Sequence, residues 1–133
     1  MSEKPPNITD IVFPKQAVQL INLTPHDIVI YHEDGETVKL VVKPSGKVAR
    51  VTVKRKKIGE INGIPVYRNE FSEVEGLPFP KRGVIYIVSI LVQQALKLRG
   101  IKRKDVVSPD TSPEGVVRDK NGKIVGTKGF QII

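Results

Sequence analysis

The stretch RGVIYIVSILVQQALKLRG, residues 82–100, is the most hydrophobic part of the chain, and it constrains the fold more than any other segment. Its apolar run, 84–92, is interrupted only by Ser89. A membrane helix needs roughly 20 apolar residues, which is about twice the length of this run. We therefore expect a core segment and no membrane span.

The residue types change at Ser89. Residues 84–88 are β-branched or aromatic, which favours a buried strand. Ser89 is a good helix N-cap, and it is followed by apolar residues at helical spacing, namely Leu91, Val92, Ala95 and Leu98. The polar residues Gln93, Gln94 and Lys97 are expected on the opposite side, and Gly100 suits the C-terminal end. With a second apolar strand near 105–107, the pattern predicts a strand–helix–strand unit whose principal helix covers about 89–99.

A serine at a strand-to-helix turn is also the position of the nucleophile in α/β-hydrolases. That turn requires a glycine two residues before the serine and another two residues after it. Ile87 and Leu91 occupy these positions here. We therefore interpret Ser89 as a structural cap.

The rest of the chain has a composition typical of strands, with abundant valine and isoleucine. Asp34-Gly35, Asn62-Gly63 and Asn121-Gly122 are turn signals. The expected strands cover 17–23, 27–32, 37–42, 48–58, 64–68, 115–119 and 123–127. The sequence thus predicts an α+β fold with a mostly antiparallel, strongly bent or partly closed sheet and one principal helix on a face.

The length of 133 residues fits one domain. Pro5, Pro6 and Asn7 interrupt the start of the chain, so we expect no cleavable signal there. Residues 1–14 are expected to be a disordered leader, and 15–133 a single α+β domain. Abundant lysine, isoleucine and valine, with no cysteine and one methionine, also suit a thermophilic source.

The chain is strongly basic, with a formal charge of +8 and a pI of about 9.8. Such an excess favours nucleic acid or another polyanion as a partner. The cations cluster in two runs, Lys54, Arg55, Lys56, Lys57 and Lys102, Arg103, Lys104. Charge runs of this kind also protect solvated sheet edges. Aromatic residues make up only 5% of the chain, so any nucleic-acid binding is expected to be weakly sequence-selective.

The candidate catalytic residues are few. The chain has no cysteine and two histidines, and on one strand His26 and His32 would be separated by roughly 20 Å, too far for one metal ion. We expect no metal site and no cofactor. If the chain is an enzyme, His26 is the candidate general base, with Asp105 or Asp110 of the 105–114 loop as its orienting carboxylate. The alternative is structural, a turn that opens a strand and a proline-bracketed connector.

Four short motifs occur in a defined order: NLTPHD (22–27), PSGKVAR (44–50), YIVS (86–89) and DVVSPDT (105–111). In this order they resemble a family of small uncharacterised proteins from bacterial genomes, phages and mobile elements. Within that family, the chain resembles an archaeal viral member. The resemblance covers the chain from about residue 20 onward. It implies a mobile-element origin and carries over no catalytic residue or ligand.

Three functions are compatible with these patterns. The working hypothesis is a non-enzymatic viral or mobile-element accessory protein that binds a partner or nucleic acid through a basic face. The second is a small-ligand-binding protein or hydrolase-like enzyme that uses the His26 turn and the 105–114 loop. The third is a virion-associated structural protein, since exposed strand edges permit homo-oligomers. The expected location is the host cytoplasm, with virion association as the alternative.

Overall fold

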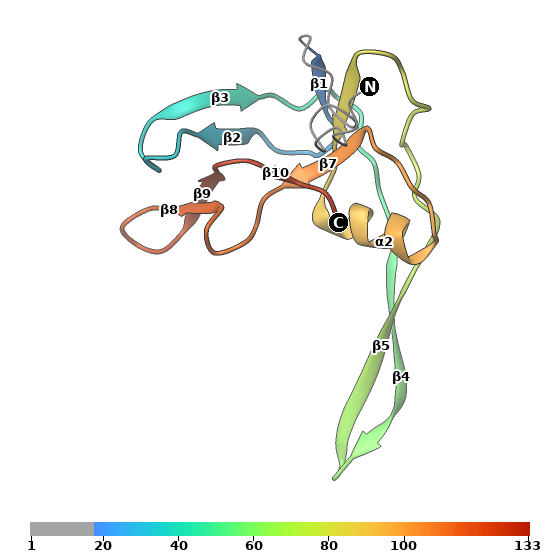
Figure 1. The fold of residues 1–133 in the computed structure, drawn as a ribbon. Coiled ribbons are helices and arrows are strands. Elements are labelled where there is room, and N and C mark those ends of the chain that lie inside the picture. The colour runs from blue at the N-terminus through green and yellow to red at the C-terminus, as the bar shows by residue number, and fades with distance from the viewer. Residues whose placement is uncertain (1–17) are drawn as a thin grey trace, which may run out of the picture.

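A computed structural model describes residues 18–133 (Figure 1). The expected leader, 1–14, lies outside the described residues. Within them the chain forms ten strands and one α-helix, so the predicted α+β class is confirmed. The strands form two four-stranded sheets and one two-stranded sheet rather than a single sheet, and these sheets are open rather than closed.

The three predicted turns each connect two consecutive strands, β2 to β3, β4 to β5 and β8 to β9. The strands are β1 (Gln19–Asn22), β2 (Ile28–Tyr31), β3 (Val38–Val42), β4 (Val53–Ile61), β5 (Ile64–Phe71), β6 (Val84–Ile87), β7 (Val106–Pro109), β8 (Val116–Arg118), β9 (Ile124–Thr127) and β10 (Phe130–Gln131). The helix is α2 (Ile90–Leu98). No helix in the described part of the chain is long and apolar enough to cross a membrane.

The first sheet has the strand order β1-β6-β7-β10. β6 pairs in parallel with both β1 and β7, and β10 joins β7 antiparallel. Side chains of β6 alternate between two buried clusters. Tyr86 packs with Val92 and Leu96 of α2 on one face. Ile85 and Ile87 pack with β2 on the other. Because both faces of β6 are covered, its sequence is a continuous apolar run rather than an alternating one.

The second sheet has the order β3-β2-β9-β8. It combines two antiparallel hairpins, β2/β3 and β8/β9, through a parallel contact between β2 and β9. The expectation of a mostly antiparallel sheet is therefore not confirmed, since parallel pairs lie at the centre of both four-stranded sheets. Hairpin turns were visible in the sequence, whereas the pairing of distant strands depends on which apolar faces meet.

The helix prediction is confirmed. The Ser89 hydroxyl accepts a 3.3 Å hydrogen bond from the Val92 amide, so Ser89 is the N-cap. Gly100, just past the helix, has a φ of +71°, a conformation in which glycine is favoured. Gln93 departs from the expectation because it is only 6% exposed and contacts β7 instead of facing solvent.

The third sheet, β4-β5, is a two-stranded hairpin that we call the arm (residues 53–71). Figure 1 shows it extending away from the rest of the fold. The first five residues of the expected strand 48–58, residues 48–52, do not belong to the arm. Ala49 is buried in the core, and Arg50 forms an isolated bridge with Glu75, so this segment is held on the body and β4 begins only at Val53.

Candidate nucleic-acid interface

The arm is a regular antiparallel hairpin. Its strands pair from Val53 with Phe71 at the base to Ile61 with Ile64 at the tip, with one irregularity at Ile58. The turn residues Asn62 and Gly63 have φ angles of 51° and 79°, both positive, as a type I′ turn requires. Asn-Gly is the preferred sequence for that turn, so the local sequence is sufficient to specify the hairpin.

The arm contributes little to the core. All nine residues of β4 are exposed, and in β5 only Val66 and Phe71 are partly buried. An isolated two-stranded hairpin is marginally stable in water. The arm is therefore held by its turn, its cross-strand pairs and its attachment to the body, and both of its faces are available to a partner.

The arm carries five cations and two carboxylates. On one face Lys56 lies directly opposite Arg68, and Lys54 lies opposite Glu70. Like charges placed directly across a strand pair destabilise it. Neither Lys56 nor Arg68 forms an ion pair with any described residue. This face thus holds two adjacent positive charges without a neutralising partner within the described fold.

The other face of the arm holds the remaining cations in local contacts. The Arg55 guanidinium lies 3.8 Å from the centroid of the Tyr67 ring, a cation–π contact. Lys57 forms a 2.7 Å salt bridge with Glu60, and both side chains are half exposed. Such an exposed pair contributes little to stability. Alternation along β4 therefore places Lys54 and Lys56 on one face and Arg55 and Lys57 on the other.

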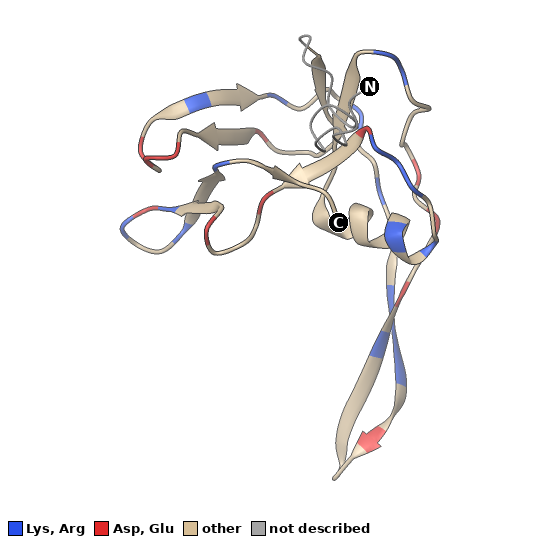
Figure 2. Cartoon of the chain, viewed as in Figure 1, with Lys and Arg blue, Asp and Glu red and all other residues tan. Residues whose placement is uncertain are grey.

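The second basic cluster starts at the end of α2 and meets the base of the arm. Arg99 donates hydrogen bonds to the backbone carbonyls of Ser72 and Phe71, at 3.3 and 3.4 Å. Lys97 on α2 and Lys102 and Lys104 in the following loop are exposed. Figure 2 shows cations on the arm, at the end of the helix and along this loop. The contacts of Arg99 join the two basic segments that the sequence placed separately.

Arg103 is held differently from its neighbours. Its guanidinium donates to both carboxylate oxygens of Asp105, at 2.8 and 2.9 Å, and to the Pro78 carbonyl at 2.9 Å. The two side chains are only 16% and 17% exposed. The hydrogen bond to Asp105 raises the pKa of Arg103. Arg103 belongs to the predicted basic cluster, and Asp105 is one of the predicted catalytic candidates. The two predicted sites therefore share one ion pair.

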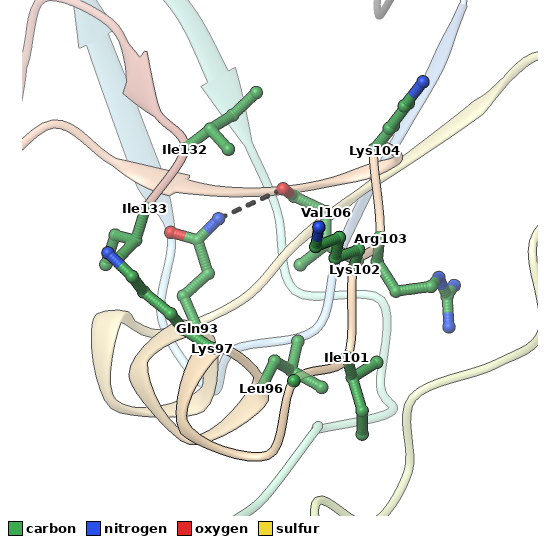
Figure 3. Close-up of a pocket in the computed structure, with 11 residues that line it drawn as sticks. Gln93, Leu96, Lys97, Ile101, Lys102, Arg103, Lys104, Val106, Ile132 and Ile133 are labelled. Atoms are coloured by element: carbon green, nitrogen blue, oxygen red, sulfur yellow. Dashed lines mark hydrogen bonds between the residues drawn. The ribbon is translucent and has the colours of Figure 1, made fainter.

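A cavity of about 400 Å³ lies between α2, the loop after it and the chain end at Ile132 and Ile133. Figure 3 shows the Gln93 amide directed from the helix toward the Val106 carbonyl, to which it donates a 3.1 Å hydrogen bond. The cavity walls are mostly apolar, and the cations of the second cluster line its rim.

The His26 turn is held by polar contacts from its neighbours. The buried Asn22 amide donates to the backbone carbonyls of His26 and Val42, at 2.7 and 3.0 Å. Its carbonyl oxygen accepts from the Thr24 amide and hydroxyl, at 2.9 and 2.7 Å. These bonds account for Asn22 and Thr24 in the NLTPHD motif. They use the backbone of His26, whose own side chain is exposed.

The three catalytic candidates are not linked by hydrogen bonds within the described structure. Asp105 is bound to Arg103, as above. Asp110 accepts a 3.0 Å hydrogen bond from the Ser112 amide, and its carboxylate lies so close to Gly115 that a Cβ at that position would clash with it. Asp110 thus shapes the connector between β7 and β8. No cluster of three metal-ligating side chains occurs in residues 18–133.

Comparisons with known proteins give no relative from which to transfer a function. No family model, curated protein or solved structure matches the chain.

Proposed function

We propose that the chain is a non-enzymatic accessory protein of a virus or mobile element that binds nucleic acid through its arm, assisted by the basic loop after α2. One observation carries the proposal. Lys56 lies opposite Arg68 on a hairpin that covers no core. Neither cation forms an ion pair with a carboxylate among the described residues. A phosphate bound between these two cations would neutralise a repulsion that the hairpin otherwise retains.

The dimensions of the arm suit a duplex. A strand of nine residues is about 30 Å long. Two-stranded β-ribbons dock in the major or the minor groove of a duplex. The arm offers lysine, arginine and aliphatic side chains, which contact phosphates and sugars more than base edges. We therefore expect affinity that depends on salt more than on sequence.

The test is binding of the full chain to a DNA duplex at about 50 and about 200 mM salt. Lys56→Gln combined with Arg68→Gln should weaken binding by about tenfold or more and lower the salt slope by about two, since each lost phosphate contact removes roughly one counterion. The matched control is Lys39→Gln with Lys123→Gln, two exposed cations, one on β3 and one in the turn that precedes β9. Undetectable binding at low salt would refute the proposal, and so would equal losses in the two double variants.

The exposed apolar side chains of the arm support a second candidate, a virion-associated or other structural protein that assembles through the arm. Ile58, Ile61 and Ile64 are between 50% and 66% exposed. Unpaired strand edges favour such assembly, whereas the net charge of +8 opposes it through self-repulsion. Sedimentation of the purified chain at low and high salt separates the two candidates. The enzyme alternative has less support because no hydrogen bond orients the His26 side chain within the described fold.

A further inference from the structure

The tip of the arm is apolar. Ile61 and Ile64 are the last cross-strand pair before the two-residue turn, and they are 64% and 66% exposed. The Asn62-Gly63 turn needs no large aliphatic neighbour to form. An isoleucine pair stabilises a hairpin by roughly 0.2–1 kcal/mol at most. The tip of a basic hairpin therefore carries two large, exposed aliphatic side chains that contribute little to the fold.

The isoleucine pair lies on the same face of the ribbon as the unneutralised cations. Arg68, Val66 and Ile64 alternate by two along β5, and their partners on β4 are Lys56, Gly59 and Ile61. Side chains two apart on a strand share a face. The cation pair and the isoleucine pair are about 13 Å apart along β5, since four residues separate Ile64 from Arg68 and each adds roughly 3.3 Å. One face thus presents positive charge on the stem and apolar surface at the tip.

We infer that Ile61 and Ile64 form an apolar wedge that enters between two stacked base pairs of duplex DNA and bends it, while Lys56 and Arg68 hold the flanking phosphates. This inference rests on the proposed nucleic-acid function and names its ligand, a duplex that can be kinked. Proteins that insert isoleucine, leucine or phenylalanine at a base step unstack it partly and bend the helix. Flexible pyrimidine–purine steps such as TA are the cheapest to open.

A second copy of the chain is the competing occupant of this tip. It would cover the isoleucines, but it would bring a further charge of +8 toward the cations of the arm. A DNA duplex satisfies both features at once, because its stacked bases are apolar and its backbone is anionic. The pairing of apolar and cationic groups on one face therefore favours DNA.

The experiment uses the full chain and a duplex of about 25 base pairs with a central TA step and a fluorescent donor and acceptor at its two ends. A 2-aminopurine base at the step reports unstacking. Wild-type protein should raise both the energy transfer and the 2-aminopurine fluorescence. Ile61→Thr with Ile64→Thr keeps β-branched side chains, so the hairpin is retained. This variant should lose both signals while its affinity falls by less than about tenfold, because the stem cations remain.

The matched control is Ile58→Thr, which changes a 50% exposed isoleucine at the irregular position of β4, away from the tip. It should bend and unstack the duplex as the wild type does. Wild-type binding without bending, or bending unchanged in the tip variant, overturns the wedge and leaves the proposed function standing. Absence of duplex binding overturns both. A dimer that the tip variant abolishes, without any effect on DNA, assigns the isoleucines to a second copy and overturns the wedge.

Discussion

The Ser108 hydroxyl on β7 donates a 2.5 Å hydrogen bond to the side-chain carbonyl oxygen of Gln93 on α2. Ser108 is fully buried and Gln93 nearly so. Because the Gln93 amide nitrogen also donates to Val106, one side chain ties the helix to the strand at two points. Buried polar groups are tolerated when their hydrogen bonds are made, and this pair fixes how α2 lies on the sheet.

We predict that Ser108→Ala destabilises the fold by about 1–3 kcal/mol, because it leaves the Gln93 carbonyl oxygen buried without its partner. Urea denaturation followed by circular dichroism measures the change. Adding Gln93→Met to Ser108→Ala should deepen the loss, because the buried Val106 carbonyl then also loses the donor of its hydrogen bond. Equal stability of Ser108→Ala and the wild type would contradict this account of the contact.

The arrangement of Arg103 predicts a separation between stability and binding. Arg103→Ala leaves the largely buried Asp105 carboxylate without its partner and should cost about 1.5–3 kcal/mol of unfolding free energy. Lys102→Ala removes an exposed cation and should change stability by less than about 0.5 kcal/mol.

The effects of these two variants on DNA binding should have the opposite order to their effects on stability. Lys102→Ala should lower the salt slope of DNA binding by about one, as loss of a phosphate contact does. Arg103→Ala, measured at a temperature at which it is folded, should leave that slope unchanged. A salt slope lowered by Arg103→Ala alone would place its guanidinium on the nucleic acid rather than in the fold.

The parts of the fold that the sequence predicted are those encoded locally. Ser89 marked the start of the helix because its hydroxyl caps an amide three residues later. Asn62-Gly63 marked its hairpin because both residues adopt the positive φ of a type I′ turn. Asp34-Gly35 marked a longer turn, in which Gly35 has a positive φ and the Asp34 carboxylate accepts from the amides of Glu36 and Thr37. The strand pairs that escaped prediction are distant. β1 and β6 pair in parallel with Gln19 beside Val84, and no local signal specifies that register.

The candidate site was predicted in part for the same reason. The charge runs were visible, but Arg103 looked like its neighbours until the structure placed Asp105 beside it. The polar side of α2 was also misassigned at Gln93, whose partner Ser108 lies 15 residues away. The projection of the arm could not be predicted, because the Asn62-Gly63 turn specifies which strands pair and not where the hairpin lies relative to the core. The joining of the two basic segments depends on Arg99, whose acceptor Ser72 is 27 residues away.

The turn between β2 and β3 is expected to lose stability in acid, through its residue Asp34. The Asp34 carboxylate accepts hydrogen bonds from the amides of Thr37 and Glu36, at 2.9 and 2.8 Å. These bonds lower the pKa of Asp34 to about 2, from 3.8. A depressed pKa means that the stabilisation is complete above pH 3.8 and is lost as the pH falls through about 2. An NMR titration of the Asp34 carboxyl should give a midpoint near 2, with the Thr37 amide shift following it. Asp34→Asn should remove that transition, and an Asp34 midpoint near 3.8 would contradict the bonding.

The stability of the core is expected to be independent of the arm. Residues 55–69 contain no buried side chain, and Val66 alone among them is partly buried. Replacing 55–69 by Asn-Gly should therefore keep the hairpin base and the contacts of Arg99, and should leave the midpoint of thermal unfolding within about 4 °C, the shift that corresponds to roughly 1 kcal/mol. The same variant should lose most of its affinity for duplex DNA at about 50 mM salt, because Lys56 and Arg68 are gone. Calorimetry and the binding assay check the two halves separately. A shortened protein that unfolds far below the wild type would give the arm a structural role, and one that binds DNA as tightly as the wild type would move the interface to the loop after α2.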